Sequence, residues 1–220
     1  MQRSPALSEF IESIRAALHS ASAPALETAG RVFAHLDRPP HAGSTKRGEE
    51  TTGDALSARA PQTTPRVTPQ VTSMASGDDN AVNFLTPALH TARNATSTAR
   101  VATAFASLAP ALTWLQRPGS EADSQFHAGH ANCLIVGPGG LEARDDVRVG
   151  ASLLAPNVRY PDHSHPPEEV YVVLSDGEWF GTAARWYRPG IGGIVHHQPG
   201  VLHAMRSGET PLLAVWCLPL

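Results

Sequence analysis

Residues 160–171 read Tyr160-Pro161-Asp162-His163-Ser164-His165-Pro166-Pro167-Glu168-Glu169-Val170-Tyr171. Imidazole, carboxylate and phenol groups are denser in this stretch than anywhere else in the chain. In an extended strand residues two apart share a face, so His163 and His165 can point to one side. Glu169 and Tyr171 share a face of the next strand by the same rule. The stretch therefore predicts two strands, interrupted by a Pro-Pro turn, that carry candidate metal ligands.

Short apolar runs separated by Gly, Pro and Asp turns flank this segment on both sides. They are Cys133–Val136, Gly150–Leu154, Val170–Leu174, Gly193–Val195 and Leu212–Leu218. Many short strands without intervening helices predict an antiparallel β-sandwich or a small barrel over residues 118–220. The fold class expected is mainly β, with one C-terminal barrel or jelly roll preceded by an α-helical N-terminal region.

The N-terminal region carries helical signals. Ser4-Pro5 is a typical helix opening, and the apolar residues that follow recur at three- and four-residue intervals. Residues 1–36 are therefore expected to form helices, with the second starting near Pro24. Residues 37–77 are rich in Pro, Gly, Ser and Thr and predict a flexible linker. Residues 78–117 return to a helical pattern and are expected to pack on the barrel.

Composition excludes several classes of function. The 220 residues carry a formal net charge of −3 without a basic stripe, which argues against a nucleic-acid partner. No stretch of 18 apolar residues predicts a membrane span, and charged residues interrupt any N-terminal signal segment, so we expect a soluble cytoplasmic protein. Cys133 and Cys217 are most simply two reduced thiols, although a single disulfide would also fit.

Histidines gather near the end of the chain. Of eleven in the sequence, five lie in this part: His163, His165, His196, His197 and His203. Imidazole and carboxylate together suit one divalent transition metal, Fe(II), Zn(II), Mn(II), Co(II) or Ni(II), and leave its identity open. The set expected to ligate is His165, Glu169 and His203. His196 and His197 are adjacent and are interpreted as structural, as are the isolated histidines elsewhere.

Two motifs resemble those of the cupin superfamily. The first runs from Gly150 through His163-x-His165-x-x-x-Glu169 to Gly177, and the second is Gly193-x5-Pro199-Gly200-x-x-His203. The resemblance covers residues 125–220. The second motif departs from the usual pattern because Pro199 and Gly200 are adjacent, and because Ser207 stands where Asn is common. Neither departure affects a candidate ligand.

A narrower resemblance is to bacterial cupin-type dimethylsulfoniopropionate lyases. It rests on the residue 160–171 stretch, on Leu174-Ser175-Asp176-Gly177-x-Trp179 and on His203-Ala204-Met205-Arg206. The resemblance implies a carbon–sulfur lyase that splits dimethylsulfoniopropionate (DMSP) into dimethyl sulfide and acrylate by β-elimination. It implies a metal held by His165, Glu169, His203 and Tyr171, with His163 close enough to ligate or to contact the substrate.

The implied chemistry assigns further roles. A phenol beside a divalent cation can form the phenolate that removes a proton, so Tyr171 is the expected general base and Tyr160 the alternative base or a positioning group. The sulfonium end of the substrate favours an aromatic face, for which Trp179 is one candidate among several aromatic residues. Arg206 is a candidate partner for the carboxylate.

Two other functions remain open from the sequence. The same ligands could serve a cupin dioxygenase or isomerase acting on another small acid, because one fold hosts many reactions. A non-catalytic cupin that binds a small ligand would keep the barrel without needing the metal. Small cupins often pair, so the resemblance also suggests a homodimer.

Overall fold

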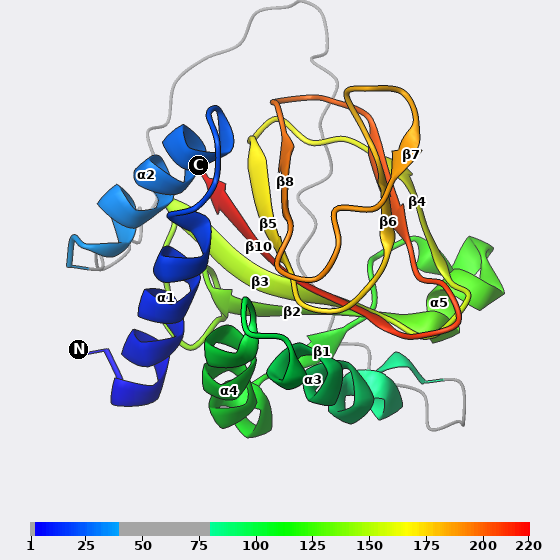
Figure 1. The fold of residues 1–220 in the computed structure, drawn as a ribbon, viewed down its shortest axis with the longest axis horizontal. Helices are drawn as coiled ribbons and strands as arrows, with labels where there is room; N and C mark the ends of the chain where they lie inside the picture. The colour runs from blue at the N-terminus through cyan, green and yellow to red at the C-terminus, as the bar shows by residue number, and fades with distance from the viewer. Residues whose placement is uncertain (1–2, 40–79) are drawn as a thin grey trace, which may run out of the picture.

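The computed structural model describes residues 3–39 and 80–220. The predicted linker, residues 37–77, lies almost entirely outside the described residues. Two antiparallel sheets face one another and enclose an apolar interior to which both contribute, for example Tyr171 from one and Met205 from the other. This is a double-sheet β-barrel, and Figure 1 shows it with α1 and α2 at the left, α3 and α4 below and α5 at the right. The predicted fold class is confirmed.

The larger sheet has six strands. In spatial order they are β1 (Trp114–Leu115), β2 (His130–Val136), β3 (Val147–Leu154), β10 (Leu212–Pro219), β5 (Glu169–Val173) and β8 (Ile194–His197). The smaller sheet contains β4 (Arg159–His163), β9 (His203–Arg206), β6 (Glu178–Phe180) and β7 (Trp186–Tyr187). Each apolar run singled out in the sequence lies largely within a strand of the larger sheet.

Helices cover the outer face of the larger sheet. They are α1 (Pro5–Leu18), α2 (Ala25–Leu36), α3 (Leu85–Asn94) and α4 (Ala99–Leu108), with 3-10 turns at Ala81–Phe84 and Ala109–Ala111. Ser4 caps α1 by accepting a hydrogen bond from the Leu7 amide, as its position predicts. No helix in the described ranges is long and apolar enough to cross a lipid bilayer.

Strand β5 is buried on both faces, and this burial determines where two of the predicted site residues point. Val170 and Val172 join the core beneath the helices, whereas Tyr171 and Val173 join the core inside the barrel. Alternation along the strand then directs Glu169 to the same side as Tyr171. The helical layer therefore supports, from behind, the strand that carries two of the predicted site residues.

The structure adds elements that the sequence pattern did not indicate. Helix α5 (Ser124–Gly129), preceded by a 3-10 turn at Ser120–Ala122, stands within the range expected to be barrel. The short strand β1 ends the range expected to be helical. Strands of the smaller sheet are short, and polar residues interrupt them: β4 reads Arg-Tyr-Pro-Asp-His and β9 reads His-Ala-Met-Arg. Both cysteines are free and buried.

A buried arginine fastens the N-terminal helices to the barrel. The side chain of Arg144 is 0% exposed and pairs with Asp146 at 2.8 Å and with Glu142 at 3.2 Å. It also donates to the backbone carbonyl oxygens of His35 at 2.7 Å and Arg38 at 2.9 Å. The His35 carbonyl lies in the last turn of α2 and the Arg38 carbonyl just beyond it, at the end of the helix where carbonyl groups lack the regular partners of the helix interior.

Replacing this arginine should destabilise the protein. Arg144→Met would remove one donor from each of two carboxylates and two carbonyl groups, although Glu142 keeps Arg3 and Asp146 keeps His35. We expect a loss of about 3 kcal/mol in the free energy of unfolding by urea. Arg100→Met is the matched control, because the Arg100–Glu9 pair is more than half exposed and should contribute little to the free energy of unfolding. Equal losses in the two variants would contradict the assigned role of Arg144.

Candidate metal and substrate site

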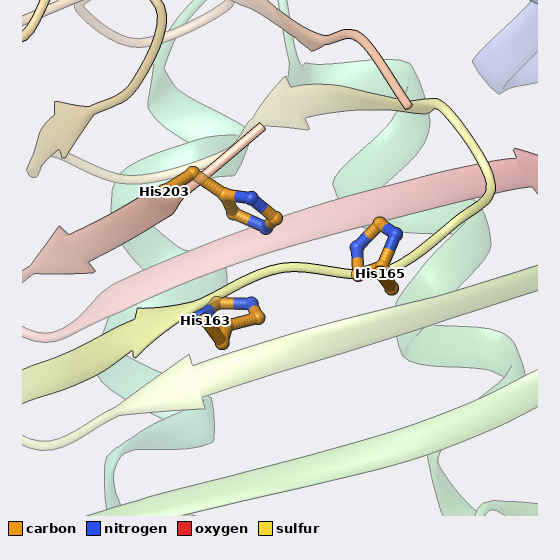
Figure 2. Close-up of side chains that lie close together, drawn as sticks. All are labelled: His163, His165 and His203. Carbon is orange, nitrogen blue, oxygen red and sulfur yellow. The ribbon is translucent and has the colours of Figure 1, made fainter. Parts of the chain in front are cut away.

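Three histidines converge at one end of the barrel. His163 ends β4, His165 lies in the loop that follows, and His203 begins β9. One ring nitrogen from each lies within 4.8 Å of the others, and Figure 2 shows the rings turned toward a shared space. His163 and His203 are register partners, with an irregularity in β4 between Tyr160 and His163. Such irregularities re-aim side chains at sites.

Local hydrogen bonds fix the tautomer of all three rings. Nδ1 of His163 lies 2.9 Å from the Pro161 carbonyl oxygen, and Nδ1 of His165 lies 2.8 Å from that of Pro167. Nδ1 of His203 lies 2.9 Å from the carbonyl oxygen of Val201. A carbonyl only accepts, so each Nδ1 carries a proton, and Nε2 is the nitrogen of each ring that is left to bind a metal. This is the arrangement that metal-binding histidines adopt.

Glu169 adds a buried carboxylate to the triad. It is 4% exposed, and its Oε2 lies 3.0 Å from Nε2 of His165 and 3.5 Å from Nε2 of His203. Burial opposes its ionisation, but the neighbouring His165 outweighs that effect and lowers the pKa of the carboxyl to about 2. Glu169 is therefore an anion, and its hydrogen bond raises the pKa of His165. A carboxylate beside imidazoles is a donor set that suits a divalent transition metal.

The donor set passes a further test of fit. Nε2 of His203 is buried and has no hydrogen-bond partner among the described residues. Burial and the adjacent His203 lower the pKa of His163 to about 4, so this ring is neutral at physiological pH. Unpartnered buried nitrogen atoms are costly unless something else bonds them. A metal coordinated by these nitrogens would satisfy the unpaired atom.

The two predicted tyrosines lie beside the triad. The Tyr160 ring is 4.8 Å from the His163 ring between centroids, and Tyr171 is 3% exposed. Burial and the charge of Glu169 raise the pKa of Tyr171 well above its ordinary value. Burial also raises the pKa of Tyr160. Neither phenol ionises at neutral pH unless a positive charge is added to the site.

A cavity of about 390 Å³ opens onto these groups. Among its lining residues are His163, His165, Glu169, Tyr160, Tyr171, Trp216, Asn132, Ser152, Arg117 and Arg148. Its volume suits a small molecule. Carboxylate, imidazole, phenol and guanidinium groups thus line one cavity, whose composition fits a small organic acid.

Two predicted substrate contacts do not reach this cavity. Trp179 is 1% exposed within the barrel core and lies outside the cavity lining. Arg206 also lies outside the lining, where it pairs with Glu178 at 2.5 Å and stacks on Trp186 at 4.3 Å. Its position three residues after His203 turns it to the other face of β9. Trp216 is the tryptophan that lines the cavity.

His197, interpreted from sequence as structural, lies directly behind the triad. Its ring stacks on His203 with centroids 4.2 Å apart, and neither ring nitrogen has a hydrogen-bond partner in the described part of the chain. Burial and the nearby His203 lower its pKa to about 3. His196 points the other way and lies 3.0 Å from the hydroxyl of Thr28 on α2. The register of His197 with Glu169 is the signal that places it inside.

Acid should destabilise the metal-free protein through His197. The unfolded chain binds a proton near pH 6.5, whereas the folded chain does not until about pH 3, so stability falls as the pH drops below about 6.5. His197→Phe keeps a ring against His203 and removes that proton. Urea unfolding at pH 6.5 and pH 5 should show about 2 kcal/mol less acid destabilisation in this variant. Equal losses in both proteins would contradict the assignment.

Some cavity residues carry no sequence signal. Asn132 and Ser152 lie on neighbouring strands as register partners, and Arg117 lies in the turn before the barrel. Single polar residues within apolar runs are unremarkable in sequence. Their convergence depends on strand pairing, which only the structure supplies.

Comparison with known proteins agrees with this geometry. A family model described as dimethylsulfoniopropionate lyase matches residues 65–214. The dimethylsulfoniopropionate lyase DddQ of Ruegeria pomeroyi is 30% identical over 122 residues, which are 54% of this chain and 61% of that protein. The DddL protein of Cereibacter sphaeroides is 31% identical over 107 residues, 48% of this chain and 44% of that protein. The aligned regions thus span less than two thirds of either relative.

Solved structures support the same fold. The crystal structure of DddQ from Ruegeria pomeroyi superposes with a TM-score of 0.59 at 21% identity, covering 98% of this chain and 92% of that one. A structure from work on the DMSP lyases RdDddP and RnDddQII gives a TM-score of 0.60 at 18% identity with the same coverage. Because the family model matches more than half of this chain, the chain belongs to the dimethylsulfoniopropionate lyase family.

Proposed function

We propose that this protein is a metal-dependent carbon–sulfur lyase that converts DMSP to dimethyl sulfide and acrylate. The observation that carries the proposal is the clustering of three imidazoles beside one cavity, which His163, His165, the Glu169 carboxylate and two phenols line. Membership of the family supports the choice of substrate. Cavity size supports a small acid over a polymer or a macromolecular partner.

The metal ligands in this proposal are His165, Glu169 and His203, with His163 completing the set. All three imidazoles present Nε2, and Glu169 supplies the anion. A bound divalent cation would act as a Lewis acid that neutralises the substrate carboxylate and favours the phenolate form of a nearby tyrosine. Tyr171 is close enough to Glu169 for its hydroxyl to interact with that carboxylate, which supports its place beside the ligands.

Tyr171 is the proposed general base. Its oxygen takes the proton from the carbon next to the substrate carboxylate, and the electron pair of that C–H bond forms the new C=C bond. The Cβ–S bond breaks, and its electron pair leaves with sulfur. Neutral dimethyl sulfide and the acrylate anion result, and Tyr171 then returns the proton to solvent. Its burial keeps water from competing for the base.

An aromatic surface is available for the sulfonium group. A trialkyl sulfonium has no hydrogen to donate, so its favourable contact is the face of an aromatic ring. Trp216 lines the cavity across from the histidines, on β10. We assign it to the sulfonium end in place of Trp179.

The direct test is an assay of both products. Metal-free protein is loaded in turn with Fe(II), Mn(II), Co(II), Ni(II) or Zn(II) and given DMSP, while dimethyl sulfide in the headspace and acrylate in solution are followed. We expect equal, metal-dependent release of the two products. Absence of both products with every metal that binds would contradict the proposed reaction and favour an oxygenase or a binding module.

Removing the Tyr171 hydroxyl should abolish turnover while sparing the metal. For Tyr171→Phe we expect bound metal to be unchanged and kcat to fall by about 10²- to 10⁴-fold, the usual contribution of a general base. The chain has three tyrosines, and Tyr187→Phe is the matched control because Tyr187 is 36% exposed outside the cavity lining. Retention of most activity in Tyr171→Phe would remove it from this role.

A further inference from the structure

A row of polar side chains runs across the interior face of the larger sheet. The Trp216 Nε1 donates to the Ser152 hydroxyl oxygen at 3.1 Å, and the Ser152 hydroxyl lies 2.6 Å from Oδ1 of Asn132. The Asn132 Nδ2 lies 3.5 Å from the Tyr160 hydroxyl oxygen, which belongs to the opposite sheet. The row thus connects β10, β3 and β2 to the phenol beside His163. All four of its members line the cavity.

The direction of these hydrogen bonds is set at the tryptophan end. An indole N–H can only donate, so the Ser152 oxygen accepts from Trp216 and its own proton is free to donate onward. The 2.6 Å separation is typical of an O–H···O bond, which identifies Oδ1 of Asn132 as the acceptor. The amide of Asn132 is then fixed with its NH₂ group toward Tyr160.

The side chain of Tyr160 therefore faces hydrogen-bond donors. Asn132 faces its oxygen, and the guanidinium of Arg117 lies 5.6 Å from its ring centre. Within residues 3–39 and 80–220, no acceptor is found for the Tyr160 hydroxyl proton. With donors on the protein side, the phenol proton is left to point into the cavity. A ligand that accepts this proton is an anion or a carbonyl group.

Gly150 makes room for the row. A Cβ at this position would collide with the Trp216 indole and with the Cys133 carbonyl oxygen. The glycine is the register partner of Trp216, two residues from Ser152 along β3. Without a side chain there, the indole can lie flat against the strand and bring its N–H to the serine. The glycine at this position therefore permits the hydrogen bond between Trp216 and Ser152.

We propose that Asn132, oriented by Ser152 and Trp216, is a positioning residue that holds Tyr160 as a hydrogen-bond donor to the carboxylate of the substrate. This inference rests on the proposed function and deepens it, because it separates the two phenols. Tyr171 removes the proton, whereas Tyr160 orients the acid end of the substrate. The row also gives Trp216 two roles, with its ring face toward the sulfonium and its N–H toward Ser152.

A double-mutant cycle tests the inference without turnover. The probe is sodium acrylate, whose dissociation constant is measured by calorimetry on the full-length protein, both metal-free and loaded with Zn(II). We expect Ser152→Ala to weaken acrylate binding about fivefold, as for loss of one hydrogen bond. In the Tyr160→Phe background the same substitution should change the affinity less than about 1.5-fold. Ser152→Thr, which retains the hydroxyl, should restore binding.

A purely structural serine would behave differently. Equal weakening by Ser152→Ala in both backgrounds would overturn the inference, as would the absence of saturable acrylate binding to the unaltered protein. If Ser152→Ala does not fold, Asn132→Leu enters the cycle with the same expectation. A protein that releases no dimethyl sulfide but shows the predicted cycle would refute the proposed lyase and keep the carboxylate subsite. The reverse result would refute only the role of Asn132.

Discussion

Alternation along one doubly buried strand organises this protein. Val170 and Val172 of β5 pack beneath the helical layer, and Glu169 and Tyr171 consequently face the barrel interior. A one-residue slip in register would move the carboxylate and the phenol to the helical side and expose two valines to the cavity. The apolar contacts with α1 and α2 therefore hold a charged side chain in a buried position. Burial of the valines on one face of β5 thus fixes the positions of Glu169 and Tyr171 on the other face.

Backbone carbonyl groups orient the three histidines that lie near Glu169. Each imidazole of the triad donates through Nδ1 to a carbonyl two residues away, so its tautomer depends on local chain geometry alone. Two of those carbonyls belong to prolines, Pro161 and Pro167. The three imidazoles and a carboxylate with a low pKa then face one another beside a cavity. The phenols of Tyr160 and Tyr171 lie beside them with raised pKa values, and a nearby positive charge would favour their ionisation.

Much of this site could be predicted because it lies within short stretches. The parity of Glu169 and Tyr171 follows from a two-residue period, and Ser4 as a helix cap follows from local chemistry. In the smaller sheet, the residue 160–171 stretch indicated β4, whereas β6, β7 and β9 gave no such signal. His197 and the Trp216–Ser152–Asn132 row depend on which strands pair and in which register, information that no single stretch holds. Trp179 shows the same limit, since composition could not tell a core tryptophan from a cavity one.

One metal ion bound by His163, His165, His203 and Glu169 would explain this arrangement. Its presence can be tested by anomalous diffraction from crystals of the Zn(II)-loaded protein, recorded above and below the zinc edge. We expect a single strong peak in the space enclosed by the three Nε2 atoms and the Glu169 carboxylate, and this peak should weaken or vanish in Glu169→Ala. A peak elsewhere, or an undiminished peak in that variant, would contradict it.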